Sequence, residues 1–400
     1  MSTHRQLDIF RNTPAGREQR MSLTEAIALT RQSLMAYGTD ASTWVMGFSG
    51  GKDSTTVATL IDWFIQSGQI PRPENLILVY SDTLMELPSL EHSAHALMDK
   101  LANRGWQIRR SVPALHTEVA KTERFFVTML GKGYPPPNNK FRWCTKRLKT
   151  QKIDSIYKSI ASEYGTNYLG IDGIRKGESA ARDRLILASC STDDGECGQG
   201  WFHKTAASTK LSPILHWRLC LVWDWIIQAW SEYGYPIDGV IETYGGMLEE
   251  DPLGFEPPSG RTGCIGCPLV TTGNPETPRP DKALQTVLQS PQWDHLAPFS
   301  ALSAIYHRLR WDNSCRHFKK SGQKGCLTLA ARQWALDEIL KIQSESARLA
   351  LAANRRPYTL ISAEEETVIR KLLTARTFPD STRYAPEELA SDKPLAVGCT

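Results

Sequence analysis

The amino-acid sequence predicts an α/β fold, with a doubly wound, mostly parallel β-sheet followed by a helical C-terminal region. Apolar runs of strand length alternate with segments whose apolar residues recur at helical spacing through the first half of the chain. A Ser-Gly-Gly-Lys-Asp-Ser turn, residues 49–54, joins the first such run to the first such segment. Polar or glycine-rich turns follow other predicted strands, at the end of a parallel sheet where ligands bind.

The chain has 400 residues, enough for one large core and a second, smaller domain. We expect an N-terminal extension at 1–22, the α/β domain at 23–250, a loop and helical region at 251–375 and a flexible tail at 376–400. Hydrophobic residues make up 41% and charged residues 22%, which excludes fibrous and disorder-dominated classes. The sequence has neither a signal peptide nor a long apolar run, so it predicts a cytoplasmic protein without membrane contact. The net charge of +4 permits a polyanionic partner.

The predicted elements of the sheet follow in order. A helix over 23–35 begins after a capping serine, a strand ends at Phe48, and a helix follows the glycine turn. The run 75–80 is apolar on both faces, as in a central parallel strand. A helix over 87–101 and strands at 106–111 and 168–173 complete the pattern.

The rest of the chain is predicted to be mainly helical. The glycine and proline run before Phe141 predicts a surface loop that leads into a basic helix. The aromatic segment 221–235 predicts a helix packed in the core, with Cys220 beside it as a buried apolar residue. Further helices are expected over 283–317 and 327–353.

The turn at 49–54 has the chemistry of a phosphate site. Adjacent glycines let the backbone approach a ligand, and the first N–H groups of a helix attract an anion. The spacing is neither that of a Walker loop nor that of the dinucleotide motif. We expect Asp53 to bind Mg²⁺ and Lys52 to donate to phosphate oxygens. The expected nucleotide site consists of Ser49, Gly50, Gly51, Lys52, Asp53, Ser54, Thr55, Asp82 and Gly170. For Asp82, capping of the next helix is an equal alternative.

The segment 170–182 carries a second candidate site. Arg175, Glu178 and Arg182 are spaced to share one helix face, where the arginines could clamp an anion and Glu178 could orient them. An exposed helix with salt bridges is the alternative.

The sequence contains nine cysteines, an odd number that argues against a disulfide framework. Cys264 and Cys267 form a Cys-x-x-Cys pair flanked by glycines, suited to a metal or cluster, to zinc or to a redox dithiol. Basic residues around Cys144 (Arg142, Lys146, Arg147 and Lys149) would stabilise an anionic cluster or substrate.

The turn at 49–54 resembles the PP-loop of ATP pyrophosphatases, in the adenine nucleotide alpha hydrolase-like superfamily. The Arg175 segment resembles the Gly-x-Arg-x-x-Glu-Ser-x-x-Arg stretch of the phosphoadenosine phosphosulfate (PAPS) reductase branch. Cys144 stands where iron–sulfur adenylyl-sulfate reductases have tandem cysteines, with Trp143 in place of the first. The resemblance implies an iron–sulfur cluster, of the 4Fe-4S type, bound by Cys144, Cys264 and Cys267. Cys197 follows the Arg175 segment in a predicted loop, and we expect it to be the fourth ligand, ahead of Cys315 and Cys190.

Together with the Phe-Arg-Trp-Cys segment at 141–144, these motifs are similar to the DndC-type and SspD-type proteins of DNA phosphorothioation. The resemblance implies an ATP pyrophosphatase and sulfurtransferase that adenylates a DNA backbone phosphate, so that sulfur can replace a non-bridging oxygen. Lys52, Asp53, Arg175, Glu178 and Arg182 are the expected catalytic residues. The implied partners are DNA, a cysteine desulfurase as sulfur donor and other subunits of a modification complex.

Three other functions remain open. A PAPS or adenylyl-sulfate reductase would use the same pocket and a C-terminal cysteine, for which Cys399 is the candidate. A tRNA-thiolating enzyme would share the adenylation chemistry, and a non-catalytic DNA-binding adaptor would need no ATP cleavage.

Overall fold

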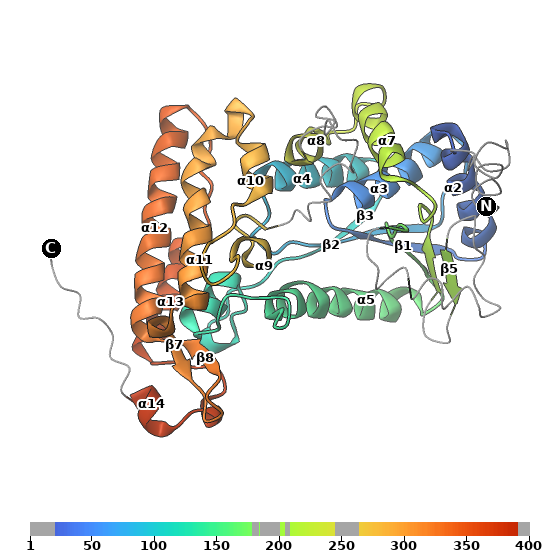
Figure 1. Cartoon of the computed structure of the whole chain (residues 1–400). Coiled ribbons are helices and arrows are strands. Elements are labelled where there is room, and N and C mark those ends of the chain that lie inside the picture. The colour runs from blue at the N-terminus through green and yellow to red at the C-terminus, as the bar shows by residue number, and fades with distance from the viewer. Residues whose placement is uncertain (1–20, 178–183, 185–200, 205–208, 245–263, 391–400) are drawn as a thin grey trace, which may run out of the picture. The chain divides into compact units, whose positions relative to one another are not determined.

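The structure, a computed structural model, describes residues 21–177, 184, 201–204, 209–244 and 264–390 (Figure 1). By its contacts the chain divides into two compact units. The first unit comprises residues 1–47, 52–76 and 166–234, and the second comprises 48–51, 77–165 and 235–400. No helix in the described ranges is long and apolar enough to cross a membrane.

The main sheet has the strand order β3-β2-β1-β4-β6-β5. In the first unit, β1 pairs in parallel with β4 and β4 pairs in parallel with β6, whereas β5 is antiparallel to β6. In the second unit, β2 and β3 are parallel. The predicted α/β class with a mostly parallel sheet and a helical C-terminal region is therefore confirmed. The six strands are β1 (Thr43–Phe48), β2 (Asn75–Ser81), β3 (Gln107–Ser111), β4 (Leu169–Ile171), β5 (Trp201–Lys204) and β6 (Thr209–Ser212).

The first unit places three helices on one face of its strands, α2 (Leu23–Gly38), α3 (Lys52–Gln66) and α7 (Leu219–Ser231) (Figure 1). Ser22 and Glu25 form a capping box at the start of α2, as the capping serine predicted. The aromatic helix α7 packs in the core through Trp223 and Trp225. Cys220, expected in the core, is exposed instead, because the buried stripe of α7 begins one residue later at Leu221.

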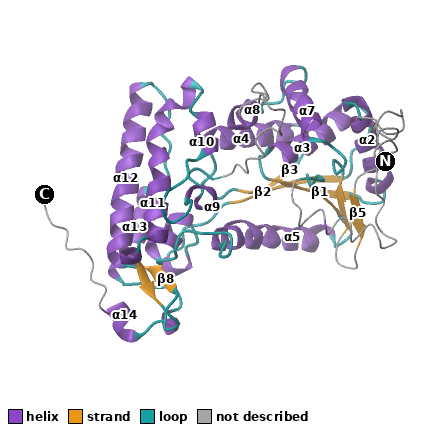
Figure 2. Ribbon diagram, in the orientation of Figure 1, coloured by secondary structure: helices purple, strands orange, loops and turns teal. Residues whose placement is uncertain are grey.

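In the second unit, helices α4 (Pro88–Asn103) and α5 (Gln151–Tyr164) lie on opposite faces of the β2–β3 pair (Figure 2). Strand β2 is buried along almost its whole length, in agreement with its continuous apolar run. The short helices α8 (Asp238–Tyr244), α9 (Pro268–Thr271) and α10 (Lys282–Val287) belong to the same unit.

The segment between β3 and α5 contains the short helices η2 (Val119–Lys121), η3 (Val127–Gly131) and η4 (Thr145–Thr150). The predicted surface loop before Phe141 is only partly at the surface, because Gly131 and Gly133 are buried. The fully buried Arg332 donates to the carbonyl oxygens of Leu130 and Gly131, which satisfies the end of η3. The hydrogen bonds from Arg332 therefore hold the start of this loop in the protein interior.

The C-terminal region is helical, with α11 and α13 packed against the 24-residue helix α12. The predicted helices over 283–317 end early, because Arg316 and His317 lie in a two-stranded hairpin. The elements are η6 (Pro291–Ala301), α11 (Leu302–Trp311), η7 (Asn313–Cys315), β7 (Arg316–Phe318), β8 (Lys324–Leu327), α12 (Leu329–Ala352), α13 (Ala363–Thr374), η8 (Ser381–Arg383) and α14 (Pro386–Ala390).

The expected tail from residue 376 has structure as far as Ala390. Tyr384 in this stretch is buried, and its hydroxyl accepts the N–H of Cys326. One buried aromatic side chain thus anchors a segment whose composition is otherwise polar. The predicted domain boundaries stay a prediction.

Candidate active site

The glycine turn lies between β1 and α3, as the sequence predicts. Gly50 has a φ of 73°, a left-handed conformation that favours glycine, and a Cβ built there would meet the Cβ of Ala94 at 3.1 Å. The hydroxyl of Ser49 accepts the N–H of Gly51 at 3.4 Å. Helix α3 begins at Lys52, so its first-turn N–H groups have no partner within the helix. The geometry is that of an anion site at a helix N-terminus.

Three charged side chains of the first unit meet at this helix start. Asp53 Oδ1 accepts from Arg175 Nε at 2.5 Å, and Asp53 Oδ2 accepts from Lys52 Nζ at 2.7 Å. The side chains of Arg175 and Asp53 are only 7% and 16% exposed, so the attraction is little screened by water. The cluster of Lys52, Asp53 and Arg175 carries one net positive charge at the N-terminal end of α3.

The loop after β4 brings Arg175 to this cluster. Gly173 lies against the start of α3, where an added Cβ would be 2.9 Å from the carbonyl carbon of Asp53 and 3.0 Å from the nitrogen of Ser54. Asp172 Oδ1 accepts the N–H of Ile174 and the hydroxyl of Ser212, which fixes the loop. The absence of a side chain at Gly173 thus allows the two segments to touch.

The predicted clamp helix is wrong at its beginning. Arg175 precedes a turn at Lys176 and Gly177, and Gly177 has a φ of 82°. Helical spacing from Arg175 is therefore broken before Glu178, and Arg175 pairs with Asp53 instead. Glu178 and Arg182 lie outside the described residues.

Asp82, at the end of β2, is fully buried and forms an ion pair with Arg110. It does not cap α4, whose N-cap is Leu87, but its Oδ1 accepts the N–H of Leu84. Burial raises the pKa of Asp82, yet the nearby His95 ring and the hydrogen bonds from Arg110 and Leu84 outweigh this and lower the pKa to about 2. The equal alternative of a helix cap is therefore excluded, and the carboxylate is held ionised.

Asp82, Glu91 and His95 form the one group of potential metal ligands within 4.8 Å among the described residues. Burial and the charge of Asp82 raise the pKa of Glu91. Arg110 already balances the charge of Asp82, which weakens the case for a cation here.

The Cys-x-x-Cys pair lies beside the end of β2 in the second unit. Glu86 forms an isolated bridge with Cys264, and the N–H of Ile265 donates to the carbonyl of Met85 at 2.7 Å. Gly266, with a φ of 60°, donates its N–H to Asp281. These bonds hold Cys264 and Cys267 on a tight turn against the strand.

Cys144 joins this pair around one cation, Lys149, whose side chain is 38% exposed. Burial works to lower the pKa of Lys149, but Cys264, Glu86, Cys267 and Cys144 together raise it. The Lys149 Nζ lies 3.7 Å from Glu86 Oε1. The three cysteines predicted as ligands are therefore gathered around the Lys149 ammonium.

The cysteines of this cluster are neutral thiols. Burial raises the pKa of Cys144 and Cys264, and it raises the pKa of Cys267 to about 11. A reactive dithiol has a lowered pKa, which argues against the redox alternative. The three sulfurs do not all lie within 4.8 Å of one another, since the described residues contain no such group. A single tetrahedral zinc would hold them about 3.8 Å apart, so the three cysteines are not arranged as a closed zinc site.

The remaining cysteines stand apart from these assignments. Cys315 is buried in η7, near Asp312 and Arg308, and Cys326 is buried in β8. Cys190, Cys197 and Cys399 lie outside the described residues. The fourth ligand therefore stays a prediction.

Sequence reasoning missed the residues that surround the predicted ones. Glu86, His95 and Arg110 were not singled out, and Lys149 was noted only as one of several basic residues. A signal for Glu86 was present, since it follows the polar turn at the carboxyl end of β2. His95 and Arg110 come from separate elements, so no local pattern marks them.

Comparison with known proteins finds a family similar to one part of this chain. Residues 43–234 match the family model described as phosphoadenosine phosphosulfate reductase domain. These 192 residues, a little under half of the chain, are therefore similar to a PAPS reductase domain. No curated protein matches the chain.

Solved structures with a similar fold include PAPS reductase from Candida auris, with 13% identity over 52% of this chain and 87% of that one, at a TM-score of 0.31. FMN adenylyltransferase from Candida glabrata has 13% sequence identity over 56% of this chain and 65% of that one, at a TM-score of 0.32. A third is the U34-tRNA thiolase NcsA from Methanococcus maripaludis with its [4Fe-4S] cluster. It has 12% sequence identity over 55% of this chain and 78% of that one, at a TM-score of 0.27.

Proposed function

We propose that this protein is an ATP pyrophosphatase and sulfurtransferase of a DNA phosphorothioation system. The observation that carries the proposal is the cluster of Lys52, Asp53 and Arg175 at the N-terminus of α3, directly after the glycine turn. It places two cations at the N-terminus of a helix, where a triphosphate would lie. The PAPS reductase-like domain supports an adenine nucleotide as the ligand.

In the proposed reaction, a DNA phosphate oxygen attacks the α-phosphate of ATP and pyrophosphate leaves. A phosphate oxygen is a poor leaving group until adenylation makes it part of an anhydride. Sulfur at the oxidation level of sulfide then attacks the DNA phosphorus, and the P–S bond forms as the P–O bond to the departing AMP breaks. Lys52 and Arg175 stabilise the charge that develops on the phosphates. When Lys52 donates to a phosphate, Asp53 Oδ2 is released and becomes available to Mg²⁺.

The residues gathered around Lys149 fit an iron–sulfur cluster. Cys144, Cys264 and Cys267 would supply soft thiolate ligands, and the Lys149 ammonium would offset part of their negative charge. A cluster bound there would supply a site for sulfur or electron transfer. Thiols must lose protons to bind iron, so we expect affinity for the cluster to fall as the pH is lowered.

The proposal is tested by measuring pyrophosphate release from ATP. Lys52→Ala and Asp53→Ala should each lower the rate by about 100-fold or more, because a preorganised charge at the reacting phosphates is lost. Asp40→Ala, which removes an exposed carboxylate of the same unit, is the matched control and should stay near the wild-type rate. Rates within threefold of wild type for both site variants would refute the assignment.

Iron content tests the cysteine assignment. After anaerobic purification, Cys264→Ser should lose most of its iron and acid-labile sulfide along with the visible absorption of the cluster. Cys220→Ser, which changes an exposed cysteine, should retain the wild-type content. Equal iron in the two variants, or zinc in place of iron, would contradict the cluster.

A second candidate is a sulfonucleotide reductase, favoured by the description of the matching family. It predicts release of sulfite from PAPS or adenylyl sulfate and no pyrophosphate from ATP. Its expected nucleophile, Cys399, lies outside the described residues. Assaying both products on one preparation separates the two functions.

A further inference from the structure

The basic segment before α5 divides its charges between two places. Lys149 lies with Cys144, Cys264 and Cys267, as described above. The side chains of Arg142, Lys146 and Arg147 instead line a pocket of about 770 Å³ that includes none of these three cysteines. The positions of these three cations are therefore not accounted for by binding at the cysteine cluster.

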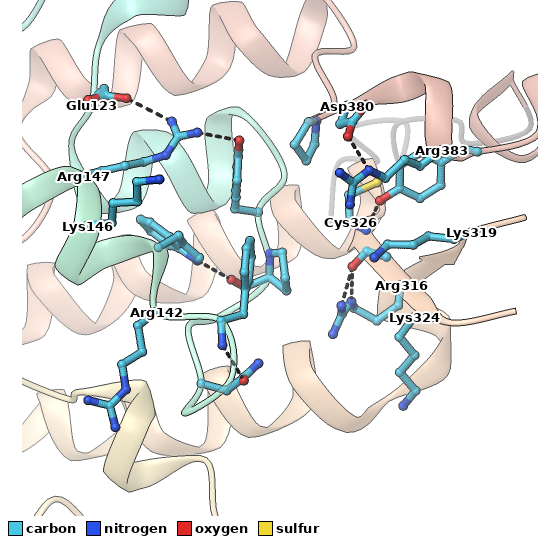
Figure 3. A pocket seen from close by; sticks show the side chains of 18 of the residues that line it. Glu123, Arg142, Lys146, Arg147, Arg316, Lys319, Lys324, Cys326, Asp380 and Arg383 are labelled. Carbon is cyan, nitrogen blue, oxygen red and sulfur yellow. Dashed lines mark hydrogen bonds and ion pairs between the residues drawn. The ribbon is translucent and has the colours of Figure 1, made fainter. Parts of the chain in front are cut away.

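The pocket is strongly positive, and all of its lining belongs to the second unit. Its lining contains seven cationic side chains against two carboxylates (Figure 3). The cations are Arg142, Lys146, Arg147, Arg316, Lys319, Lys324 and Arg383. Figure 3 shows Arg142, Lys146 and Arg147 on one side and the hairpin cations on the other.

Most of this charge has no carboxylate partner in the part of the chain that the structure describes. Arg147 pairs with Glu123 at 3.0 Å, and Arg383 pairs with Asp380. The other five cations have no carboxylate partner among the described residues. Arg316 is 9% exposed, and its guanidinium donates only to backbone carbonyl oxygens, those of Gly325 and Arg310. Like charges held together in this way favour a ligand with several negative charges.

Aromatic rings lie among the cations. Phe141 is 43% exposed and stacks on Tyr134, with ring centroids 6.3 Å apart and an interplanar angle of 8°. The guanidinium of Arg147, in η4, lies 4.8 Å from the centre of the Tyr134 ring and helps to hold that ring in place. An exposed aromatic ring held in place beside several cations is the arrangement with which proteins stack an unpaired base.

We propose that this pocket binds a single-stranded stretch of DNA, with its backbone phosphates on the cations and a base on Phe141. The choice of DNA over other single strands rests on the proposed function; the preference for an unpaired strand rests on the exposed ring and on a concave site of suitable size. The pocket then holds the polymer through contacts separate from the ATP-binding turn.

The test uses the full chain without ATP and a fluorescent 20-nucleotide single-stranded oligodeoxynucleotide, with affinity measured by anisotropy at several salt concentrations. Lys146→Ala/Lys319→Ala removes one cation from each side of the pocket; neither side chain has a hydrogen-bond partner among the described residues. Lys320→Ala/Lys371→Ala, two exposed lysines that do not line the pocket, is the matched control. We expect the pocket pair to bind about tenfold more weakly and its salt slope to fall by about 1.4, at about 0.7 per lost phosphate contact. Equal loss in the two pairs would overturn the proposal.

Phe141→Ala separates stacking from charge. It should weaken binding by about 5- to 150-fold with an unchanged salt slope, because a stacked base contributes about 1–3 kcal/mol. An unchanged affinity, or equally tight binding of the matching duplex, would overturn the single-strand assignment. Tighter binding of the oligoribonucleotide would overturn the choice of DNA. If the wild-type chain releases pyrophosphate but does not bind the oligonucleotide, this inference fails alone; if it binds DNA but leaves ATP intact, the proposed function fails alone.

Discussion

Asp53 illustrates how much of the site is decided by single residues. Its two oxygens each receive one cation, so the carboxylate positions Lys52 and Arg175 before any ligand binds. This differs from the sequence-based role of Asp53 as a metal ligand alone. The short motif 49–54 could reveal the phosphate chemistry, but the partner of Asp53 comes from Arg175, 122 positions further along the chain. No local pattern could have supplied it.

The buried charge of Asp82 predicts how stability depends on pH. Its pKa is lowered to about 2, so the folded state is favoured above the unfolded-state value, near 3.8, and this advantage is lost as the pH falls towards 2. We expect Asp82→Asn to cost on the order of 2 kcal/mol at pH 7 and to remove the part of the acid destabilisation that lies between pH 4 and 2.

The measurement is the free energy of unfolding in urea from pH 7 to pH 2. The variant and wild type should converge as the pH falls. A gap that stays constant over this range would show that the carboxylate does not titrate with a lowered pKa.

At the scale of elements, strands and helices with a clear apolar pattern were predictable from the sequence. Strand β2 and helices α2 and α4 follow the expected ranges closely. Two elements were not predicted correctly from the sequence. The β5–β6 pair is too short to show a period of its own, and the expected clamp helix is interrupted by the left-handed Gly177. The loop before Phe141 turns inward because of Arg332, a residue about 200 positions away.

The contact of the β4 loop with α3 predicts an effect of Gly173. A methyl group there would lie 2.9–3.0 Å from the backbone of Asp53 and Ser54, so either the loop or the helix start must move. We expect Gly173→Ala to cost about 1–3 kcal/mol of stability and to lower pyrophosphate release from the folded fraction, because Arg175 is displaced from Asp53.

Gly68→Ala is the control, since it has open space but a left-handed φ of 70°. It should lose stability for backbone reasons alone and keep the wild-type rate per folded molecule. Thermal unfolding and the pyrophosphate assay, run together, distinguish the two. An unchanged rate for Gly173→Ala would contradict the positioning role of the loop.

For the whole molecule, the alternation of strands and helices was enough to predict the α/β class, and the described residues add the sheet order and the division into two units. The grouping of Cys144 with Cys264 and Cys267 was expected only from the resemblance to iron–sulfur reductases, because the residues are 120 positions apart. The positive pocket could not be expected, since its cations come from the segment before α5, the β7–β8 hairpin and η8. Such a surface is visible only once these segments are folded together.

The central claim is that this protein splits ATP between the α- and β-phosphates. The most direct measurement is the identity of the products when the purified, anaerobically prepared protein is incubated with α-³²P-labelled ATP, Mg²⁺ and DNA. Our account predicts labelled AMP, or label transferred to DNA, with an equal amount of pyrophosphate. Labelled ADP with free phosphate, or intact ATP, would contradict it.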